Sequence, residues 1–163
     1  MFARPATLGD AAAIAHIYNQ GIEDRLATFE TRLRKPEDIH AWFDDVHPIV
    51  VVEDEGAVMA WASTSTYRSR ACYAGIAEFS VYVAREARGR GAGRVAMETL
   101  IAAAAQAKFW KLVSRVFPEN LASRALLRKV GFREVGLYEK HGQLDGLWRD
   151  VVIVEYVIAE NLF

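Results

Sequence analysis

The sequence predicts an α+β protein in which helices cover a mixed β-sheet. Apolar residues recur at helical spacing near the N-terminus, β-branched and alternating runs follow, and strand-like and helix-like segments then alternate to the C-terminus. The resulting order, β-α-α-β-β-β-α-β-α-β-β, is typical of the α+β class. A chain of 163 residues, 52% of them hydrophobic, can bury one sizeable core but not two, so we expect a single domain over residues 1–163.

Two helices are expected in the first third of the chain. Thr7-Leu8-Gly9-Asp10 resembles a capping box, which predicts a helix from about Asp10 to Asp24. Its apolar residues fall at helical spacing: Ala13, Ile14, Ile17, Tyr18 and Ile22. Residues 23–34 are polar and predict a loop. Pro36 stands where a first helical residue would, which predicts a second short helix that ends before His47-Pro48.

Three strands are expected in the middle of the chain. Ile49–Val52 is β-branched, Ala57–Thr66 is apolar with small polar residues, and the turn Asp54-Glu55-Gly56 between them predicts a hairpin. The third strand is expected from about Tyr73 to Val83. Its far end carries the alternation Phe79, Val81, Val83.

The C-terminal half continues with alternating elements. An alanine-rich helix is expected to about Ala107, then a strand over Lys111–Phe117 and a helix over Leu121–Val130. Val135–Tyr138 and Val151–Val157 are expected to close the sheet as a pair of strands.

Composition excludes several classes of partner and site. The formal net charge is −1 with both signs interleaved, so we expect no nucleic-acid or membrane partner, and instead a small molecule or a second copy of the chain. Cys72 is the only cysteine, which excludes an intrachain disulfide or a thiolate metal cluster and suits a reducing cytoplasm. The N-terminus lacks a signal pattern, and no apolar run approaches the ~20 residues that span a bilayer.

A glycine-rich turn after Val83 is the first feature with chemical meaning. Gly89, Gly91 and Gly93 lack a Cβ, so the backbone N–H groups can approach a ligand closely, and the following helix adds a partial positive charge at its start. A diphosphate suits both features, with arginines to contact it at positions Arg88, Arg90 and Arg94. The alternative is an ordinary strand-to-helix loop with solvated arginines. A dinucleotide fold is disfavoured, because the turn lies in mid-chain with no acidic residue after a second parallel strand.

Two segments together resemble a known superfamily. Arg88-Gly89-Arg90-Gly91-Ala92-Gly93 matches the Gln/Arg-x-x-Gly-x-Gly/Ala motif of GNAT N-acetyltransferases, and Asn120-Leu121-Ala122-Ser123 with Val130-Gly131-Phe132 resembles their second acetyl-CoA segment. The resemblance implies a mixed, mostly antiparallel sheet flanked by helices, with acetyl-CoA as co-substrate and no metal. The residues that it implies bind acetyl-CoA are Val81, Tyr82, Val83, Arg88, Gly89, Arg90, Gly91, Ala92, Gly93, Arg94, Asn120 and Ser123.

The implied role of Val81 and Val83 also has a physical basis. A pantetheine arm carries amide groups spaced like those of a peptide, so the edge of a splayed strand can add it as an extra strand. The backbone amides of Val81 and Val83 would then pair with the arm, and the turn amides would hold the pyrophosphate.

Further segments resemble one group within the superfamily. Residues 64–73 and 77–83, Thr28-Phe29-Glu30 and Gly146–Asp150 look like phosphinothricin acetyltransferases over nearly the whole chain. Members, including methionine sulfoximine and arsinothricin acetyltransferases, acetylate the α-amine of glutamate-like toxic amino acids and thereby confer resistance. Residues 17–23 and Tyr138-Glu139-Lys140-His141 look closest to the arsinothricin branch. We expect a cytoplasmic homodimer.

Amine acylation needs a base, and Glu78 is our candidate. An ammonium must lose its proton before its lone pair can attack a thioester. Glu78 precedes the pantetheine segment, and the resemblance implies the same role, directly or through water. The alternative is a glutamate paired structurally with an arginine. A free strand N–H, such as that of Val81, would stabilise the oxyanion of the tetrahedral intermediate.

The sequence departs from the family pattern at Leu127. Many relatives have a tyrosine or histidine there, thought to protonate the leaving thiolate, which leucine cannot do. His141, Tyr138 or Tyr82 are the possible substitutes, or the thiolate leaves unaided because a thiol has a pKa near ~8.5. His141 has the alternative of a surface residue. The remaining histidines lack metal-ligand spacing and are expected to be structural or exposed: His16, His40 and His47.

Substrate contacts are expected just before Glu78 and in the first loop. A glutamate analogue carries an α-carboxylate and a second polar head, so it needs cationic or hydrogen-bonding partners. The candidates are Arg68, Arg70, Tyr73, Phe29 and Glu30, with Glu30 available for the ammonium and Arg68 having the alternative of a solvated hairpin residue. The tryptophans are expected in the core, with Trp148 also a candidate for a subunit interface: Trp42, Trp61, Trp110 and Trp148.

Two other functions remain open from the sequence. The first is acetylation of a polyamine, an aminoglycoside or a protein N-terminus, although Arg68 and Arg70 would repel such cations. The second is a non-catalytic acyl-CoA-binding protein, which only Leu127 favours.

Overall fold

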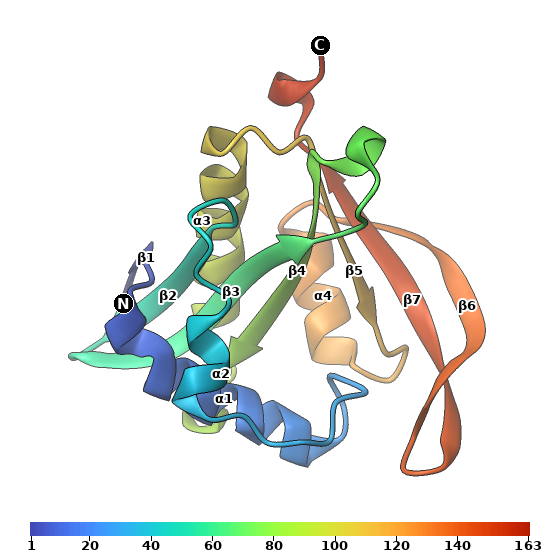
Figure 1. Cartoon of the computed structure of the whole chain (residues 1–163). Helices are drawn as coiled ribbons and strands as arrows, with labels where there is room; N and C mark the ends of the chain where they lie inside the picture. Colours follow the sequence, from blue (N-terminus) through green and yellow to red (C-terminus); the bar gives the residue numbers. More distant parts are fainter.

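The computed structural model describes residues 1–163 as seven strands and four α-helices, joined by short 3₁₀ turns (Figure 1). The strands are β1 (Phe2–Pro5), β2 (Ile49–Asp54), β3 (Ala57–Thr66), β4 (Ile76–Val83), β5 (Lys111–Val116), β6 (Arg133–Leu144) and β7 (Leu147–Val157). The helices are α1 (Ala11–Asp24), α2 (Pro36–His40), α3 (Ala92–Gln106) and α4 (Leu121–Lys129). No helix has the length and apolar character that crossing a membrane requires.

The seven strands form one sheet in the order β1-β2-β3-β4-β5-β7-β6. Every neighbouring pair is antiparallel except β4 and β5, which are parallel. The predicted α+β class and the mixed, mostly antiparallel sheet are therefore confirmed.

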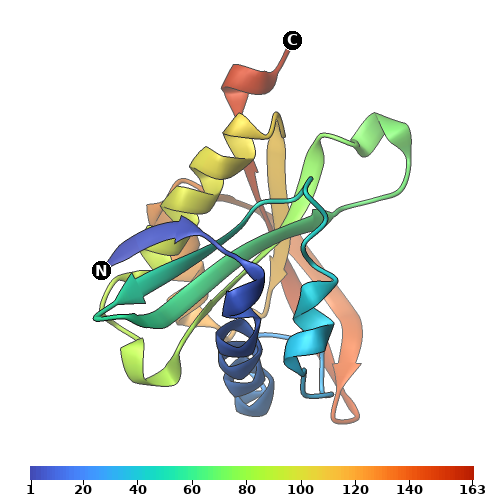
Figure 2. The same ribbon diagram turned by 60° about the vertical axis from the view of Figure 1, so that its left-hand side comes forward.

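Helices cover both faces of the sheet (Figure 2). On one face Met97 and Leu100 of α3 belong to a cluster of 19 buried residues that includes Val52 and Leu112 of the strands. On the other face Ile14 and Ile17 of α1 pack with Trp61 and Val51 in a second cluster of 10. Because side chains alternate along a strand, even-numbered residues of β4 and odd-numbered residues of β3 face α1 and α2.

Several boundaries differ from the sequence-based prediction. Tyr73 lies in a 3₁₀ turn, Ala71–Tyr73, so β4 begins only at Ile76. The closing hairpin is much longer than expected, because its two strands continue to a tight turn in which Asp145 and Gly146 have φ values of +51° and +78°. This part of the hairpin escaped prediction because its residues are mostly polar and exposed, with Leu144 as its one buried side chain.

One core assignment is wrong. Trp61 is buried with 1% exposure and Trp42 and Trp110 are half-buried, but Trp148 is 58% exposed at the tip of the β6–β7 hairpin. Trp148 therefore contributes to the surface of the single chain and not to its core.

Candidate active site

The site begins where β4 and β5 separate. The two strands pair over only three positions, Ile76–Glu78 against Lys111–Val113, and then diverge (Figure 1). Just beyond the last pair, Ser114 Oγ donates a 2.8 Å hydrogen bond to the Phe79 carbonyl oxygen. A side chain thus takes the place of the missing strand-to-strand bond, and the gap opens from that point.

The backbone of β4 presents hydrogen-bonding groups to this gap. The Phe79 carbonyl points toward β5, because Ser114 of β5 donates to it. The N–H and C=O of a strand residue point the same way and alternate along an antiparallel ladder, so the groups of Val81 and Val83 share that direction. These are the two residues whose amides the sequence predicts to bind a pantetheine arm, and the geometry fits that role.

A cavity of about 430 Å³ surrounds the gap. It draws its walls from α1, the α1–α2 loop, β3, β4, β5, α4 and β7. Its lining residues include the predicted Phe29, Glu30, Glu78, Val81, Tyr82, Asn120 and Ser123, together with Leu127. Residues far apart in the sequence therefore converge on one space.

The glycine turn lies at the start of α3. Gly89 and Gly91 have φ values of +79° and +87°, in the left-handed region that favours glycine. A Cβ at either residue would meet no atom within 4 Å, so the requirement for glycine is conformational and the space above the turn is open. Gly91 is the N-cap of α3 and supplies no side chain to cap the helix, which leaves the first N–H groups available to an anion.

Gly93 has a different structural reason. A Cβ there would lie 2.9 Å from Leu126 Cδ2 and 3.3 Å from Val83 Cγ2. Glycine therefore lets the first turn of α3 approach β4 and α4 without displacing these two side chains, beside a buried Ala92. The same glycine series thus shapes the turn and packs the helix behind it.

The three arginines of the turn are already paired with carboxylates. Arg88 contacts Asp24 at 2.7 Å, Arg90 contacts Asp54 at 2.8 Å, and Arg94 contacts Glu98 at 2.7 Å. Their side chains are about half exposed, where ion pairs contribute little to stability. An arriving diphosphate would compete with these carboxylates, so each predicted contact requires an exchange of partners.

Glu78 lines the cavity at the mouth of the gap. Its Oε1 lies 2.7 Å from the Arg115 guanidinium, with side-chain exposures of 30% for Glu78 and 49% for Arg115. The alternative of a glutamate paired with an arginine is therefore present in the structure. It is compatible with the role of a base, because both side chains line the cavity and neither is sealed from it.

Asn120 and Ser123 flank the start of α4. Asn120 is the N-cap, and its Oδ1 accepts a 3.2 Å hydrogen bond from the Ser123 backbone N–H. Leu127, one helical turn further, lines the same cavity at 2% exposure. Position 127, where the family pattern predicts a proton donor, thus lines the cavity with an aliphatic side chain.

Two tyrosines border the cavity from the α1 side. Tyr18 and Tyr82 have ring centroids 5.0 Å apart, and Tyr82 also stacks on Trp61 at 4.9 Å. Burial raises the pKa of both phenols, which keeps them protonated at neutral pH. Of the three proposed substitutes for the missing donor, Tyr82 lines the cavity, whereas Tyr138 and His141 are exposed on β6 and do not.

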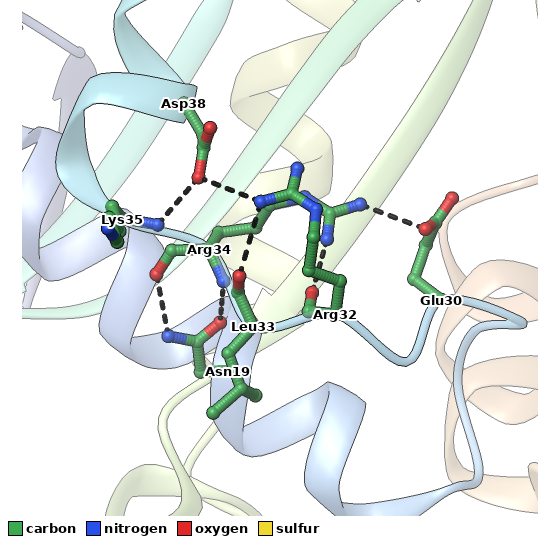
Figure 3. A network of polar contacts seen from close by, with 7 residues as sticks. All are labelled: Asn19, Glu30, Arg32, Leu33, Arg34, Lys35 and Asp38. Atoms are coloured by element: carbon green, nitrogen blue, oxygen red, sulfur yellow. Dashed lines mark hydrogen bonds and ion pairs between the residues drawn. The ribbon is translucent and has the colours of Figure 1, made fainter.

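A polar network joins the α1–α2 loop to α1 (Figure 3), and Glu30 of this loop lines the cavity. Asn19 clamps Arg34 through two hydrogen bonds, from its Nδ2 to the Arg34 carbonyl at 2.9 Å and from the Arg34 N–H to its Oδ1 at 2.7 Å. The Arg34 guanidinium in turn holds Glu30 at 2.9 Å and lies 5.5 Å from the Tyr18 ring centroid. Phe29 packs edge-on against Phe117 with centroids 4.9 Å apart. Contacts with Asn19 of α1 and with Phe117, together with the Arg34–Glu30 ion pair, therefore fix the position of the loop.

Three predicted substrate contacts lie elsewhere. Arg68, Arg70 and Tyr73 do not line the cavity in this structure. Arg68 lies 4.9 Å from the Tyr67 ring centroid and Arg70 5.8 Å from that of Tyr73, in the exposed connection between β3 and β4. They form a separate cluster on the single chain.

Tyr18, Ser114, Arg115 and Phe117 line the cavity and were missed from the sequence. A signal existed for Arg115, because Ser114-Arg115 interrupts an otherwise apolar strand. Tyr18 was hidden by its place in the helical apolar pattern. No group of three or more His, Cys, Asp or Glu side chains is arranged to hold a metal ion.

Comparison with known proteins identifies the family of the chain. The family described as "Acetyltransferase (GNAT) family" matches residues 15–132. The chain is 30% identical to the phosphinothricin N-acetyltransferase of Streptomyces coelicolor, covering 93% of each chain. It is 31% identical to the L-methionine sulfoximine/L-methionine sulfone acetyltransferase of Pseudomonas aeruginosa, covering 93% of this chain and 91% of that one.

Solved structures show the same fold. The ribosomal-protein-alanine N-acetyltransferase from Brucella melitensis superimposes with a TM-score of 0.91 at 35% identity, covering 96% of this chain and 99% of that chain. The phosphinothricin acetyltransferase from Sinorhizobium meliloti, in complex with acetyl-CoA, has a TM-score of 0.87 at 29% identity, covering 95% and 86%. The chain therefore belongs to the acetyltransferase (GNAT) family.

Proposed function

We propose that this enzyme acetylates the α-amine of a glutamate-analogue amino acid, of the class that includes methionine sulfoximine, phosphinothricin and arsinothricin. The observation that carries the proposal is the cavity at the β4–β5 gap, in which Glu78 and Arg115 lie together at the place where the thioester would emerge. The names of the relatives support this substrate class.

The chemistry follows from the residues at the gap. Glu78 accepts a proton from the substrate ammonium, directly or through water, and the freed lone pair attacks the thioester carbonyl. The Val81 N–H stabilises the resulting oxyanion. A C–N bond forms, the nitrogen loses its second proton to solvent, the C–S bond breaks, and the thiolate of coenzyme A leaves with the electron pair. Leu127 cannot protonate that thiolate, so the proton comes from Tyr82 or from solvent.

The donor site rests mainly on backbone groups. We infer that Val81, Tyr82 and Val83 of β4 hold the pantetheine arm and that residues 88–94 hold the diphosphate, with Asn120 and Ser123 beside them. Since few side chains are needed, acetyl-CoA should bind without the amine substrate. In this order of binding, the thioester is already positioned in the site when the amine substrate enters.

Discrimination against glutamate is expected from the shape of the substrate head. A planar carboxylate cannot fill a site shaped for a tetrahedral arsinate, phosphinate or sulfoximine, so polar partners would be left unpaired. Such discrimination would protect the abundant glutamate of the cell. The expected consequence of the reaction is resistance to the toxic analogue.

The test is a thiol-release assay over an amine panel. We expect the highest kcat/KM among arsinothricin, phosphinothricin and methionine sulfoximine, a much lower value for glutamate, and none for a polyamine. If the polyamine or an alanine N-terminal peptide is the best substrate, the amino-acid assignment is wrong. A second candidate, a non-catalytic acyl-CoA-binding protein, is favoured by Leu127, and it would bind acetyl-CoA in calorimetry while acetylating no amine.

We further propose that the enzyme is cytoplasmic, since acetyl-CoA is a cytoplasmic metabolite, and that it forms a homodimer. The β6–β7 hairpin exposes four large apolar side chains at 51, 52, 69 and 58%: Leu137 and Tyr138 on the edge strand β6, and Leu147 and Trp148 on β7. Light scattering should give twice the chain mass, and Trp148→Glu should shift it toward the monomer. A monomeric wild type at micromolar concentration would exclude the dimer.

A further inference from the structure

Arg115 carries the one positive charge on the wall of the active-site cavity. The charged lining residues are Glu30, Glu78 and Arg115. Two other arginines stand behind the wall and have partners there: Arg34 contacts Glu30 at 2.9 Å, and Arg149 contacts Glu119 at 3.2 Å. An anionic group inside the cavity therefore has a single cation within the lining to meet.

We propose that Arg115 binds the α-carboxylate of the amino-acid substrate and so selects α-amino acids over simple amines. This inference rests on the proposed N-acetylation of an amino acid. The guanidinium is suited to the task, because its planar fork can donate two parallel hydrogen bonds to a carboxylate.

The placement of Arg115 follows from strand register. Val113 is the last residue of β5 paired with β4, and it lies opposite Glu78. Arg115 is two residues further along, so it leaves β5 on the same face as Val113 and reaches back to Glu78 at 2.7 Å. The two charges thus stand on opposite sides of the mouth of the gap.

The Glu78–Arg115 pair is a charge complement of an α-amino acid. Such a substrate carries an ammonium and a carboxylate on one carbon atom. When it enters, its ammonium can replace the guanidinium at Glu78, and its carboxylate can replace Glu78 at Arg115. Neither protein charge is then left without a partner when the substrate displaces water, whereas an unpaired charge there would be costly. The exchange also brings the amine to the proposed base.

The exchange starts from a weak pair. Arg115 is 49% exposed and Glu78 30%, so solvent screens their attraction in the free enzyme. Water leaves when the substrate fills the cavity, and the new contacts become stronger in the drier surroundings.

The experiment compares methionine sulfone with its α-carboxamide, in which a neutral amide replaces the carboxylate. Both are assayed with the wild type, Arg115→Met, Arg115→Lys and Arg133→Met. Arg133 is the matched control, because it forms a similar ion pair with Glu155 at 2.6 Å outside the cavity. Acetyl-CoA affinity, measured by calorimetry, reports that each variant is folded.

Arg115→Met should raise KM for methionine sulfone by about 10–100-fold, with a smaller change in kcat, and should leave KM for the carboxamide nearly unchanged. Arg115→Lys should recover part of the loss, and Arg133→Met should behave as the wild type. The wild type itself should prefer the acid to the carboxamide by a similar factor, a comparison that needs no variant.

Three results would overturn the inference. If Arg115→Met weakens both substrates equally, or lowers kcat for both without affecting KM, Arg115 serves only to position Glu78. If the wild type has the same kcat/KM for methionine sulfone and for its α-carboxamide, the proposed function stands but Arg115 does not bind the α-carboxylate. If the wild type acetylates other amines and no amino acid, the proposed function fails, and the role of Arg115 fails with it.

Discussion

Gly91 offers a direct test of the diphosphate cradle. It caps α3 at φ +87° and ψ 4°, and a Cβ at this position would meet no atom within 4 Å. Gly91→Ala therefore adds no clash, and its cost is that of an L-residue in the left-handed region, about 1–2 kcal/mol. If the variant keeps the turn, the cost lowers Tm by about 2–8 °C for a chain of this size. If the turn relaxes, acetyl-CoA must restore it, and Kd rises by about 5–30-fold.

Gly146→Ala is the matched control for this substitution. Gly146 has φ +78° and equally open space, but it lies in the β6–β7 turn. It should show the loss in Tm without a change in Kd. Gly91→Asp adds a negative charge beside the bound diphosphate, with a repulsion on the order of 1–3 kcal/mol. Calorimetry with acetyl-CoA and thermal unfolding by circular dichroism measure both quantities, and unchanged Kd in folded Gly91→Ala and Gly91→Asp would refute the cradle.

Three further changes probe other parts of the site and fold. Glu78→Gln should lower kcat by about 10²–10⁴-fold with little effect on acetyl-CoA affinity, and near-normal turnover would remove Glu78 as the base. Asn120→Ala should cost about 1 kcal/mol of stability through loss of the α4 cap, whereas Asn120→Asp should retain it; equal Tm values would contradict this. Burial opposes ionisation of Asp44, but hydrogen bonds from His47 and Val46 outweigh it and lower the pKa to about 2. Because the pKa is lowered in the fold, ionised Asp44 stabilises the fold above the unfolded pKa near ~3.9, and this stabilisation is lost as pH falls toward 2. Asp44→Asn should therefore reduce the dependence of the free energy of unfolding on pH between these values. A pH dependence equal to that of the wild type would contradict this.

The predictable parts of the fold were those with a strong local pattern. The first helix, the β2–β3 hairpin and the α3 turn each combine apolar period with a start or stop signal, and each lies where the sequence placed it. The β6–β7 hairpin is the exception, since its outer residues face solvent and have no apolar period. The dipeptide Asp145-Gly146, typical of tight hairpins, was the available signal.

The site was predictable where a motif carries it and not where tertiary contact creates it. Glu78, Val81 and Asn120 follow from local motifs and do line one cavity. Arg115 enters that cavity only because β5 returns after α3 to pair in parallel with β4, a relation that no short segment contains. Arg68 and Arg70 show the reverse case, because their nearness to Glu78 in sequence does not bring them into the cavity lining.

The divergence of β4 from β5 leaves an open seam inside the sheet. Unpaired strand edges normally lie at the rim of a sheet, where they invite other chains to add. Here β4 and β5 are joined across the seam by three residue pairs, one serine hydroxyl and the Glu78–Arg115 ion pair. The pantetheine arm of acetyl-CoA, paired along β4, would act as an eighth strand of the sheet and would link its two halves. We therefore expect the fold to be most stable with the intact donor bound, before the acetyl group is transferred.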